Sequence, residues 1–398
     1  MRIGILTFHS QLNYGGVLQC WALQTALEKM GHEVVVLDLW RTFGNRALLG
    51  PFGSLSFKQW LKLIARSLVK GSLDFSSAIR YWRTIRFVRT KLHLTRFHFY
   101  QWADLQYPID LDCVVVGSDQ VWHCGDWGDP RPFLLEGAPP VPAIAYAASF
   151  GMRVIPQSFQ AKLPNEQRIE TIHAFKRGLS RFSAIGCREH EGIELCATLG
   201  FKAVHVCDPT LLPLSPTSIM GRQNRNARKG NKVVCYFLKE DIPSKIDMLD
   251  RWTKHMKWTA DLFGPGDIAW HKQCCDVAKG KTIKLKVAAG PLQFLDALYD
   301  ADACISDSFH ALAISLLFGV NVRLLKPRSS PQKEMASRIE EFANSFCEGT
   351  VFCEHLSAAL DSIASGVRTR TRNLELDAFR SQSQIWLASE LEKISCKF

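Results

Sequence analysis

The chain has 398 residues, of which 47% are apolar and 22% charged, and a formal net charge of +11. This length predicts two or three domains, and the composition is ordinary for a globular protein that buries a sizeable core. Thirteen cysteines without a CxxC pair favour neither a zinc ribbon nor a disulfide framework, and no run of about 18 apolar residues indicates a membrane-spanning helix. Most cysteines lie in apolar runs and no signal peptide is visible, so we expect free thiols in a cytoplasmic protein.

Strands and helices are predicted to alternate through the first half of the chain. A strand at residues 3–7, a helix at 17–30 and a strand at 33–37 form a βαβ unit, which implies a parallel sheet covered by helices. The first turn contains only Gly15 and Gly16 and is not a GxGxxG dinucleotide fingerprint. Further strands are expected at 111–116, 143–147, 184–187 and 203–206, and further helices at 166–179 and 191–199.

Most of the positive charge lies in one segment, residues 54–100. It holds ten Lys and Arg residues against one acid, so it carries nine of the eleven net charges. Its apolar residues fall at helical spacing, which predicts a basic helical insertion. Two interpretations stay open: a solvated cover, or a cover that also contacts an anionic membrane surface. Because no nucleic-acid motif accompanies the segment, we expect no nucleic-acid partner.

A second α/β unit is predicted after a break in the pattern. Residues 213–231 are rich in Pro, Gly and Arg and contain no strand-like run, so they are interpreted as a linker between an N-terminal lobe, 1–212, and a C-terminal lobe, 232–398. The second lobe ends in an amphipathic helix at 377–394. Two such lobes facing each other across a cleft give a GT-B-like architecture, in which the ligand lies between the lobes.

The strongest candidate site lies in the second lobe. An apolar strand at 303–305 ends in a polar turn that contains Asp307 and Ser308, and His310 follows at the start of a helix. Ligands of open α/β sheets bind where strands end and helices begin. His310 can supply a proton near neutral pH, and Asp307 can orient it or act as a base. The competing interpretation is that Asp307 or Ser308 caps the helix and His310 merely packs.

Polar residues also follow three strands of the first lobe. Arg188 can grip a carboxylate or phosphate with two parallel hydrogen bonds, or else pair with Glu189 or Glu191. Trp122 is interpreted as a stacking surface for a sugar. Capping and tight turns are the competing roles of the others. The candidate binding residues are Asn13, Tyr14, Gly15 and Gly16 in the first loop, Ser118, Asp119 and Gln120 after the strand at 111–116, and Arg188 after the strand at 184–187.

A metal site is not expected. His271, Cys274 and Cys275 form an HxxCC run, but adjacent cysteines rarely both bind one zinc ion, and further ligands at suitable spacing are lacking.

Several motifs in order resemble those of the polysaccharide pyruvyl transferase family. They cover most of the chain, and the ordered set is far more specific than any single motif. The motifs are ILTFHSQLNYGGVLQCWALQTALEKMGHEV from residue 5, VVVGSDQVW from 114, YAASFG from 146, CRE from 187, CDPTLL from 207 and ISDSFHALAISLLFGV from 305.

The resemblance implies a GT-B-like fold, phosphoenolpyruvate as the donor and no cofactor or metal. It also implies transfer of a pyruvyl group to a sugar, often as a ketal, with a glycan or lipid-linked oligosaccharide precursor of a surface polysaccharide as the acceptor. His310 would be the acid or a donor contact. Some members carry an arginine two positions before this histidine, where this chain has Ser308, and Arg323 or Lys326 are candidates to replace it. Two alternatives stay open: a GT-B glycosyltransferase that uses a nucleotide sugar, and a non-catalytic glycan-binding relative.

Overall fold

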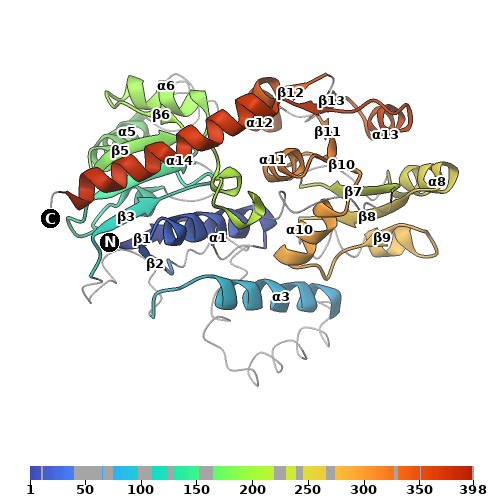
Figure 1. The fold of residues 1–398 in the computed structure, drawn as a ribbon, viewed down its shortest axis with the longest axis horizontal. Coiled ribbons are helices and arrows are strands. Elements are labelled where there is room, and N and C mark those ends of the chain that lie inside the picture. The colour runs from blue at the N-terminus through green and yellow to red at the C-terminus, as the bar shows by residue number, and fades with distance from the viewer. Residues whose placement is uncertain are drawn as a thin grey trace.

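The computed structural model describes residues 1–9, 12–39, 65, 75–96, 110–123, 130–151, 165–218, 230–238, 245–265, 274–326, 330–349 and 351–396. These residues form two α/β lobes, each built on a six-stranded parallel sheet, as the sequence predicts (Figure 1). The strands are nearly all apolar because helices cover both faces of a parallel sheet.

The first lobe has the strand order β2-β1-β3-β4-β5-β6. Its strands are β1 (Arg2–Leu6), β2 (Glu33–Val36), β3 (Cys113–Val116), β4 (Ala143–Ala148), β5 (Phe182–Cys187) and β6 (Val204–His205). Its helices include α1 (Tyr14–Lys29), α5 (Asn165–Leu179) and α6 (His190–Thr198), with short turns of helix η4 (Arg131–Leu134) and η5 (Pro209–Leu211). The carboxyl ends of β3, β4, β5 and β6 therefore meet along one edge of this sheet.

The second lobe has the strand order β13-β11-β10-β7-β8-β9. Its strands are β7 (Lys232–Tyr236), β8 (Thr259–Phe263), β9 (Lys284–Leu285), β10 (Ala303–Ser306), β11 (Asn321–Leu325) and β13 (Phe352–Cys353). The helices are α8 (Ile246–Met256), α10 (Pro291–Tyr299), α11 (Phe309–Leu317), α12 (Ser330–Phe346) and α13 (Leu356–Ala364), and β12 (Cys347–Glu348) pairs with β14 (Arg370–Thr371) in a small antiparallel ribbon. Because β10 lies between β7 and β11, its carboxyl end is at the middle of the sheet.

The last helix, α14 (Asn373–Ser395), crosses back from the second lobe and packs on the first (Figure 1, red). Ser383 Oγ accepts a hydrogen bond from Cys207 N, Arg380 Nε donates to the Leu211 carbonyl, and Trp386 stacks on Tyr146 with ring centroids 6.3 Å apart. The sequence assigned this helix to the lobe 232–398. That assignment is corrected here because a periodic apolar face shows that a helix packs, but not on which lobe.

The predicted linker, 213–231, is also only partly separate from the first lobe. Ser215, Thr217 and Ser218 are buried, and the Ser215 and Thr217 hydroxyls hydrogen-bond the Thr210 carbonyl. Residues 219–229 lie outside the described residues. The start of the predicted linker is therefore part of the first lobe.

The basic segment is described at residue 65 and over 75–96, where it forms α3 (Phe75–Lys91). Arg80 is buried and donates to the Leu12 carbonyl of the first lobe and to the Gly264 carbonyl of the second. Arg83 donates to the Ala288 carbonyl. This helix therefore joins the lobes instead of only covering them. Contact with a membrane stays a prediction, and none of the described helices has the length and apolar character needed to cross a bilayer.

Candidate active site

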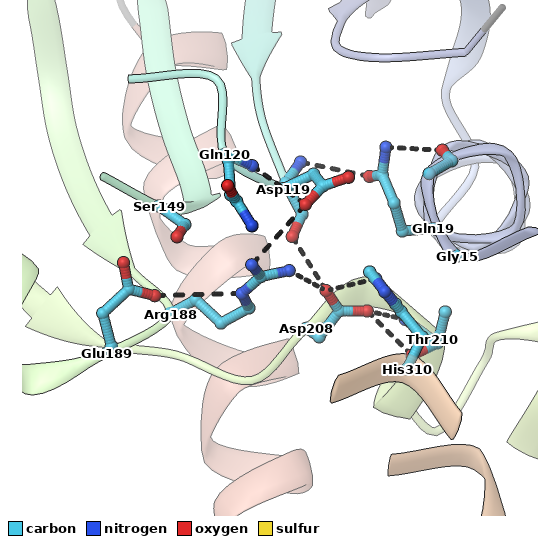
Figure 2. Close-up of polar contacts among 12 residues, drawn as sticks. Gly15, Gln19, Asp119, Gln120, Ser149, Arg188, Glu189, Asp208, Thr210 and His310 are labelled. Atoms are coloured by element: carbon cyan, nitrogen blue, oxygen red, sulfur yellow. Dashed lines mark hydrogen bonds and ion pairs between the residues drawn. The ribbon is translucent and has the colours of Figure 1, made fainter. Parts of the chain in front are cut away.

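Asp208 lies at the centre of a buried polar cluster between the two lobes (Figure 2). It follows β6 and caps η5, with Oδ1 accepting from Thr210 N at 3.0 Å and from Thr210 Oγ1 at 2.7 Å. Its Oδ2 accepts from Ser118 Oγ at 2.9 Å and from Arg188 Nη1 at 3.0 Å. His310 Nε2 lies 3.5 Å from the same oxygen. One carboxylate thus connects strand ends of the first lobe with a histidine of the second.

The charges of this cluster depend on one another. Burial by itself would raise the pKa of Asp208, but His310, Arg188 and the Thr210 N–H hold that pKa well below its usual range. Burial likewise opposes the charge of Arg188, while Asp208, Asp119 and Glu189 raise its pKa. The folded protein therefore keeps Asp208 ionised and Arg188 protonated without contact with water.

Arg188 stands at the end of β5, as the sequence predicts. Its guanidinium lies 3.6 Å from Asp119 Oδ1 and 3.8 Å from Glu189 Oε2, and its Cζ is 4.6 Å from the centroid of the Phe309 ring. Phe309 belongs to the second lobe, so this cation–π contact holds Arg188 against the element that carries His310. The position suits a group that binds an anion between the lobes.

His310 lies in the first turn of α11 and is 6% exposed. Gly15, in the first turn of α1, packs directly against it, because a Cβ at Gly15 would be 2.2 Å from His310 Nδ1. No side chain could be accommodated there without moving the imidazole. The amino-terminal ends of α1 and α11 thus approach each other across the lobe boundary, and both favour an anion.

The two residues predicted beside His310, Ser308 and Asp307, each accept a hydrogen bond from a backbone N–H. Ser308 is the N-cap of α11, with Oγ accepting from Ala311 N at 3.5 Å, which is the capping role that the sequence left open. Asp307 Oδ1 accepts from Leu238 N at 2.7 Å. His310 Nε2 faces the carboxylate of Asp208, so Asp208 is a partner of the histidine that the sequence did not single out. A role for Asp307 as a base toward the acceptor stays a prediction.

The predicted first loop is the start of α1. Asn13 is the N-cap and accepts a hydrogen bond from Gly15 N at 3.0 Å, while Gly16 supplies its carbonyl to the side chain of Gln19. Tyr14 is 1% exposed and stacks on Phe294 at 4.7 Å, so it belongs to the aromatic core that joins the lobes. The structure therefore does not support direct ligand binding by Tyr14. The sequence could not show this, because an aromatic residue next to glycines has the same local pattern in a core as in a binding site.

The residues that follow β3 are all buried, and they contact either the polar cluster or the apolar core. Ser118 donates to Asp208, and Ser118 N donates to Gln19 Oε1 at 3.2 Å. Asp119, with φ 72°, faces Arg188. Trp122 is fully buried, donates to the Phe133 carbonyl and packs on Phe150, so its interpretation as a sugar platform is wrong. An indole that follows a buried strand is as readily part of the core as of a binding surface.

Sequence reasoning missed three contributors to this cluster. Asp208 is part of the CDPTLL motif, and a carboxylate directly after a strand was the available signal. Gln19, one turn into α1, donates to Thr7 Oγ1 and Phe8 O. Arg338 of α12 gives both terminal guanidinium nitrogens to Gln120 when the amide oxygen of Gln120 is turned toward α12. Arg338 is about 150 residues from Arg188 in the chain, and nothing local in the sequence marks it.

A second polar group lies at the outer rim of the same boundary. The potential ligand atoms of His190, His205 and Glu341 lie within 4.8 Å of one another, so this group is a possible metal-ligand set among the described residues. The side chains already bond one another and the backbone: His190 Nδ1 contacts Glu341, and His205 Nε2 is 3.1 Å from the Arg188 carbonyl. Of the HxxCC run, His271 lies outside the described residues.

The chain matches the polysaccharide pyruvyl transferase family over residues 13–329. It belongs to that family. A comparison with curated proteins gave no match. Among solved structures, the UDP-GlcNAc 2-epimerase of Neisseria meningitidis bound to UDP-GlcNAc is 10% identical, with a TM-score of 0.51 over 99% of this chain and 100% of that one. A protein described as a UDP-N-acetylglucosamine 2-epimerase from Listeria monocytogenes is 11% identical, with a TM-score of 0.53 over 95% and 90%.

These comparisons confirm the family and the GT-B-like fold that the motif set predicts. At this low identity the solved structures show the fold alone. The family match covers the ordered motifs from residue 13 onward, with Arg188, Asp208 and His310, and it supports transferase activity in polysaccharide pyruvylation.

Proposed function

We propose that this transferase moves the pyruvyl group of phosphoenolpyruvate onto a sugar hydroxyl, as a ketal where two hydroxyls are available. The observation that carries the proposal is the convergence of His310 and Arg188 on the buried Asp208 at the boundary between the lobes. A proton donor and an anion-binding guanidinium are the two groups that this donor requires. The family match supports the transfer of a pyruvyl group, and the geometry supports the choice of donor.

In the proposed reaction His310 gives a proton to the methylene carbon of phosphoenolpyruvate. The adjacent carbon becomes electrophilic and accepts the oxygen of a sugar hydroxyl, whose proton leaves to a base. A second hydroxyl then forms the other carbon–oxygen bond as the carbon–oxygen bond to phosphate breaks. The proton of this second hydroxyl leaves with the phosphate, which gives the ketal and inorganic phosphate. The role of Asp208 is to hold His310 in place.

The acceptor in this proposal is a glycan or lipid-linked oligosaccharide that is a precursor of a surface polysaccharide or exopolysaccharide. The reaction takes place in the cytoplasm, with the basic segment available for peripheral contact with anionic lipid at the inner face of the membrane. Phosphoenolpyruvate is a substrate here, and the proposed steps call for no cofactor.

The test is release of inorganic phosphate from phosphoenolpyruvate in the presence of candidate glycan acceptors. His310→Ala is expected to lower the rate by ~10²–10⁴-fold, because general acid catalysis contributes about that much. His190→Ala is the matched control, since His190 also opens a helix at the lobe boundary but is exposed. Full activity of His310→Ala would remove His310 from the mechanism.

A nucleotide-sugar donor is the main competing function. It is favoured by the likeness of the fold to an epimerase solved with UDP-GlcNAc. Thermal stabilisation by UDP- or GDP-sugars, with none by phosphoenolpyruvate, would support it. Glycan binding that survives His310→Ala, without turnover of any donor, would instead indicate a non-catalytic relative.

A further inference from the structure

Arg338 of α12 lies beside Arg188 although the two belong to different lobes. With the amide oxygen of Gln120 turned toward α12, the terminal nitrogens of Arg338 donate to this residue, which follows β3 of the first lobe. One turn further along α12, Phe342 packs on Phe309 with ring centroids 5.3 Å apart. The guanidinium of Arg188 also lies over the Phe309 ring, 4.6 Å from its centroid. Two guanidinium groups and His310 therefore surround one region between α11, α12 and the end of β5.

Three nitrogen atoms of this region are buried without a hydrogen-bond partner among the described residues. They are Nε of Arg188, Nε of Arg338 and Nε2 of His310. Arg188 and His310 are each only 6% exposed, so water does not replace the missing partners freely. Buried polar groups nearly always have partners, and an enclosed group without one indicates a ligand or a strained site. Arg188 Nε lies 3.8 Å from Glu189 Oε2 and His310 Nε2 lies 3.5 Å from Asp208 Oδ2, so both face a carboxylate by charge without forming a hydrogen bond. The three nitrogens therefore keep hydrogen-bonding capacity that the oxygens of a ligand can use.

The charges of the surrounding side chains indicate that a ligand bound in this region is an anion. Burial and the charge of Arg188 lower the pKa of Arg338 to about 10, with Glu189, Asp119 and Glu191 offsetting part of the effect. Two guanidinium groups held close together in an enclosed site repel each other, and a bound anion would relieve that repulsion. The fork of hydrogen-bond donors on arginine fits carboxylate and phosphate oxygens.

Neither candidate cation of the adjoining strand serves this region. Arg323 is fully buried and donates to Ser362 Oγ, Asn321 Oδ1 and the Val367 carbonyl within its own lobe. Lys326 pairs with Glu354 at 2.5 Å on the surface. The expectation that one of them replaces a cation at Ser308 is therefore wrong, because both have other partners.

We propose that Arg338 is a substrate-binding residue that acts with Arg188 as a two-lobe anion clamp. The ligand class is a small molecule with two anionic groups, one held by the guanidinium of each lobe. For phosphoenolpyruvate these groups are the carboxylate and the phosphate, so this assignment rests on the proposed function. Because α12 belongs to the second lobe, a ligand with two anionic groups binds fully only when both lobes are in contact.

The test is binding of phosphoenolpyruvate to the full chain by calorimetry, beside turnover measurements. Arg338→Gln is expected to weaken binding tenfold or more and to raise KM far more than it lowers kcat, because charge-assisted hydrogen bonds are lost. Arg338→Lys keeps the charge without the fork and is expected to fall between Arg338→Gln and wild type. Glu340→Gln, an exposed change on the same helix, is the matched control and should bind as wild type.

The outcomes separate the clamp from the proposed function. Wild-type affinity in both Arg338 variants overturns the clamp and leaves the function standing. A third outcome is that inorganic phosphate or a UDP-sugar stabilises the wild-type protein thermally but not Arg338→Gln, while phosphoenolpyruvate does not bind. This outcome supports the clamp and contradicts the assignment of phosphoenolpyruvate as the donor. If Arg338→Gln does not fold, Arg338→Lys decides the matter. A purely structural role for Arg338 predicts a lower Tm for that variant with unchanged affinity.

Discussion

Two of the imidazole–carboxylate pairs that join the lobes, His310–Asp208 and His190–Glu341, differ in almost every other respect. His310 and Asp208 lie 3.5 Å apart with side chains 7% and 0% exposed. His190 and Glu341 form a hydrogen bond at the rim with side chains 59% and 22% exposed. Near the first pair, Nε of Arg188 and Nε of Arg338 make no hydrogen bond among the described residues. In the second pair, His190 uses both its ring Nδ1 and its backbone N–H on Glu341.

The comparison shows what distinguishes a reacting centre from an inter-lobe contact built of the same residue types. An exposed pair has water for its remaining hydrogen bonds and little dependence on its partner. A buried pair relies on a few fixed neighbours, so its charges and geometry are set by the fold. We therefore expect changes at the inner pair to alter chemistry and changes at the outer pair to alter only how stability depends on pH.

The largest expected difference comes from removing one carboxylate charge in each pair. Asp208→Asn keeps the shape but no longer balances Arg188 or orients His310, so we expect turnover to fall by ~10³-fold. Loss of the buried partner should also lower the free energy of unfolding by about 3 kcal/mol. Glu341→Gln is the matched change at the rim and should leave turnover within a few-fold. Steady-state kinetics and urea unfolding measure both, and equal losses in the two variants would contradict the comparison.

A smaller effect is expected from adding one methyl group beside the inner pair. The Cβ of Gly15→Ala would meet the His310 ring 2.4 Å from Cγ, so the imidazole must shift. A displacement of about 1 Å can cost ~10²-fold in rate. In the background of His310→Ala the methyl group has room, so the loss of stability caused by Gly15→Ala should disappear. A double-mutant cycle of Tm and turnover that shows no coupling would contradict this packing.

The smallest effect concerns acid stability at the rim. Burial and the neighbouring His190 lower the pKa of His205 to about 4. The unfolded chain, in which histidine has a pKa of about 6.5, therefore takes up the proton first as the pH falls. Stability is lost between those two values, by about 2 kcal/mol on going from pH 7.5 to pH 5. Glu341, whose pKa burial raises, acts in the opposite direction at lower pH.

His205→Gln should flatten this part of the pH profile without changing kcat. Chemical unfolding at pH 7.5 and pH 5 gives the measurement. An unchanged slope in the variant would mean that another group is responsible for the acid sensitivity.

The sequence predicted the parts of this site that are local in the chain. The strand before His310, the arginine at the end of β5 and the glycines near Asn13 each lie at a strand end or helix start, where periodicity and turn residues carry a signal. It did not predict which carboxylate pairs with His310, because Asp307 is adjacent in the chain whereas Asp208 is about 100 residues away. Trp122 and Tyr14 were assigned to binding because burial cannot be read from an aromatic residue beside a polar turn.

By itself, the sequence determined the family, the two parallel α/β lobes and the histidine at the start of α11. These follow from short-range patterns: alternating apolar runs, helix caps and an ordered set of motifs. Only the tertiary structure decided that α14 returns to the first lobe, that Asp208 holds Arg188 and His310, and that Arg338 comes from the opposite lobe to join them. The physical reason is that pairing between charged groups depends on distance in space and on burial, and neither is encoded by separation along the chain.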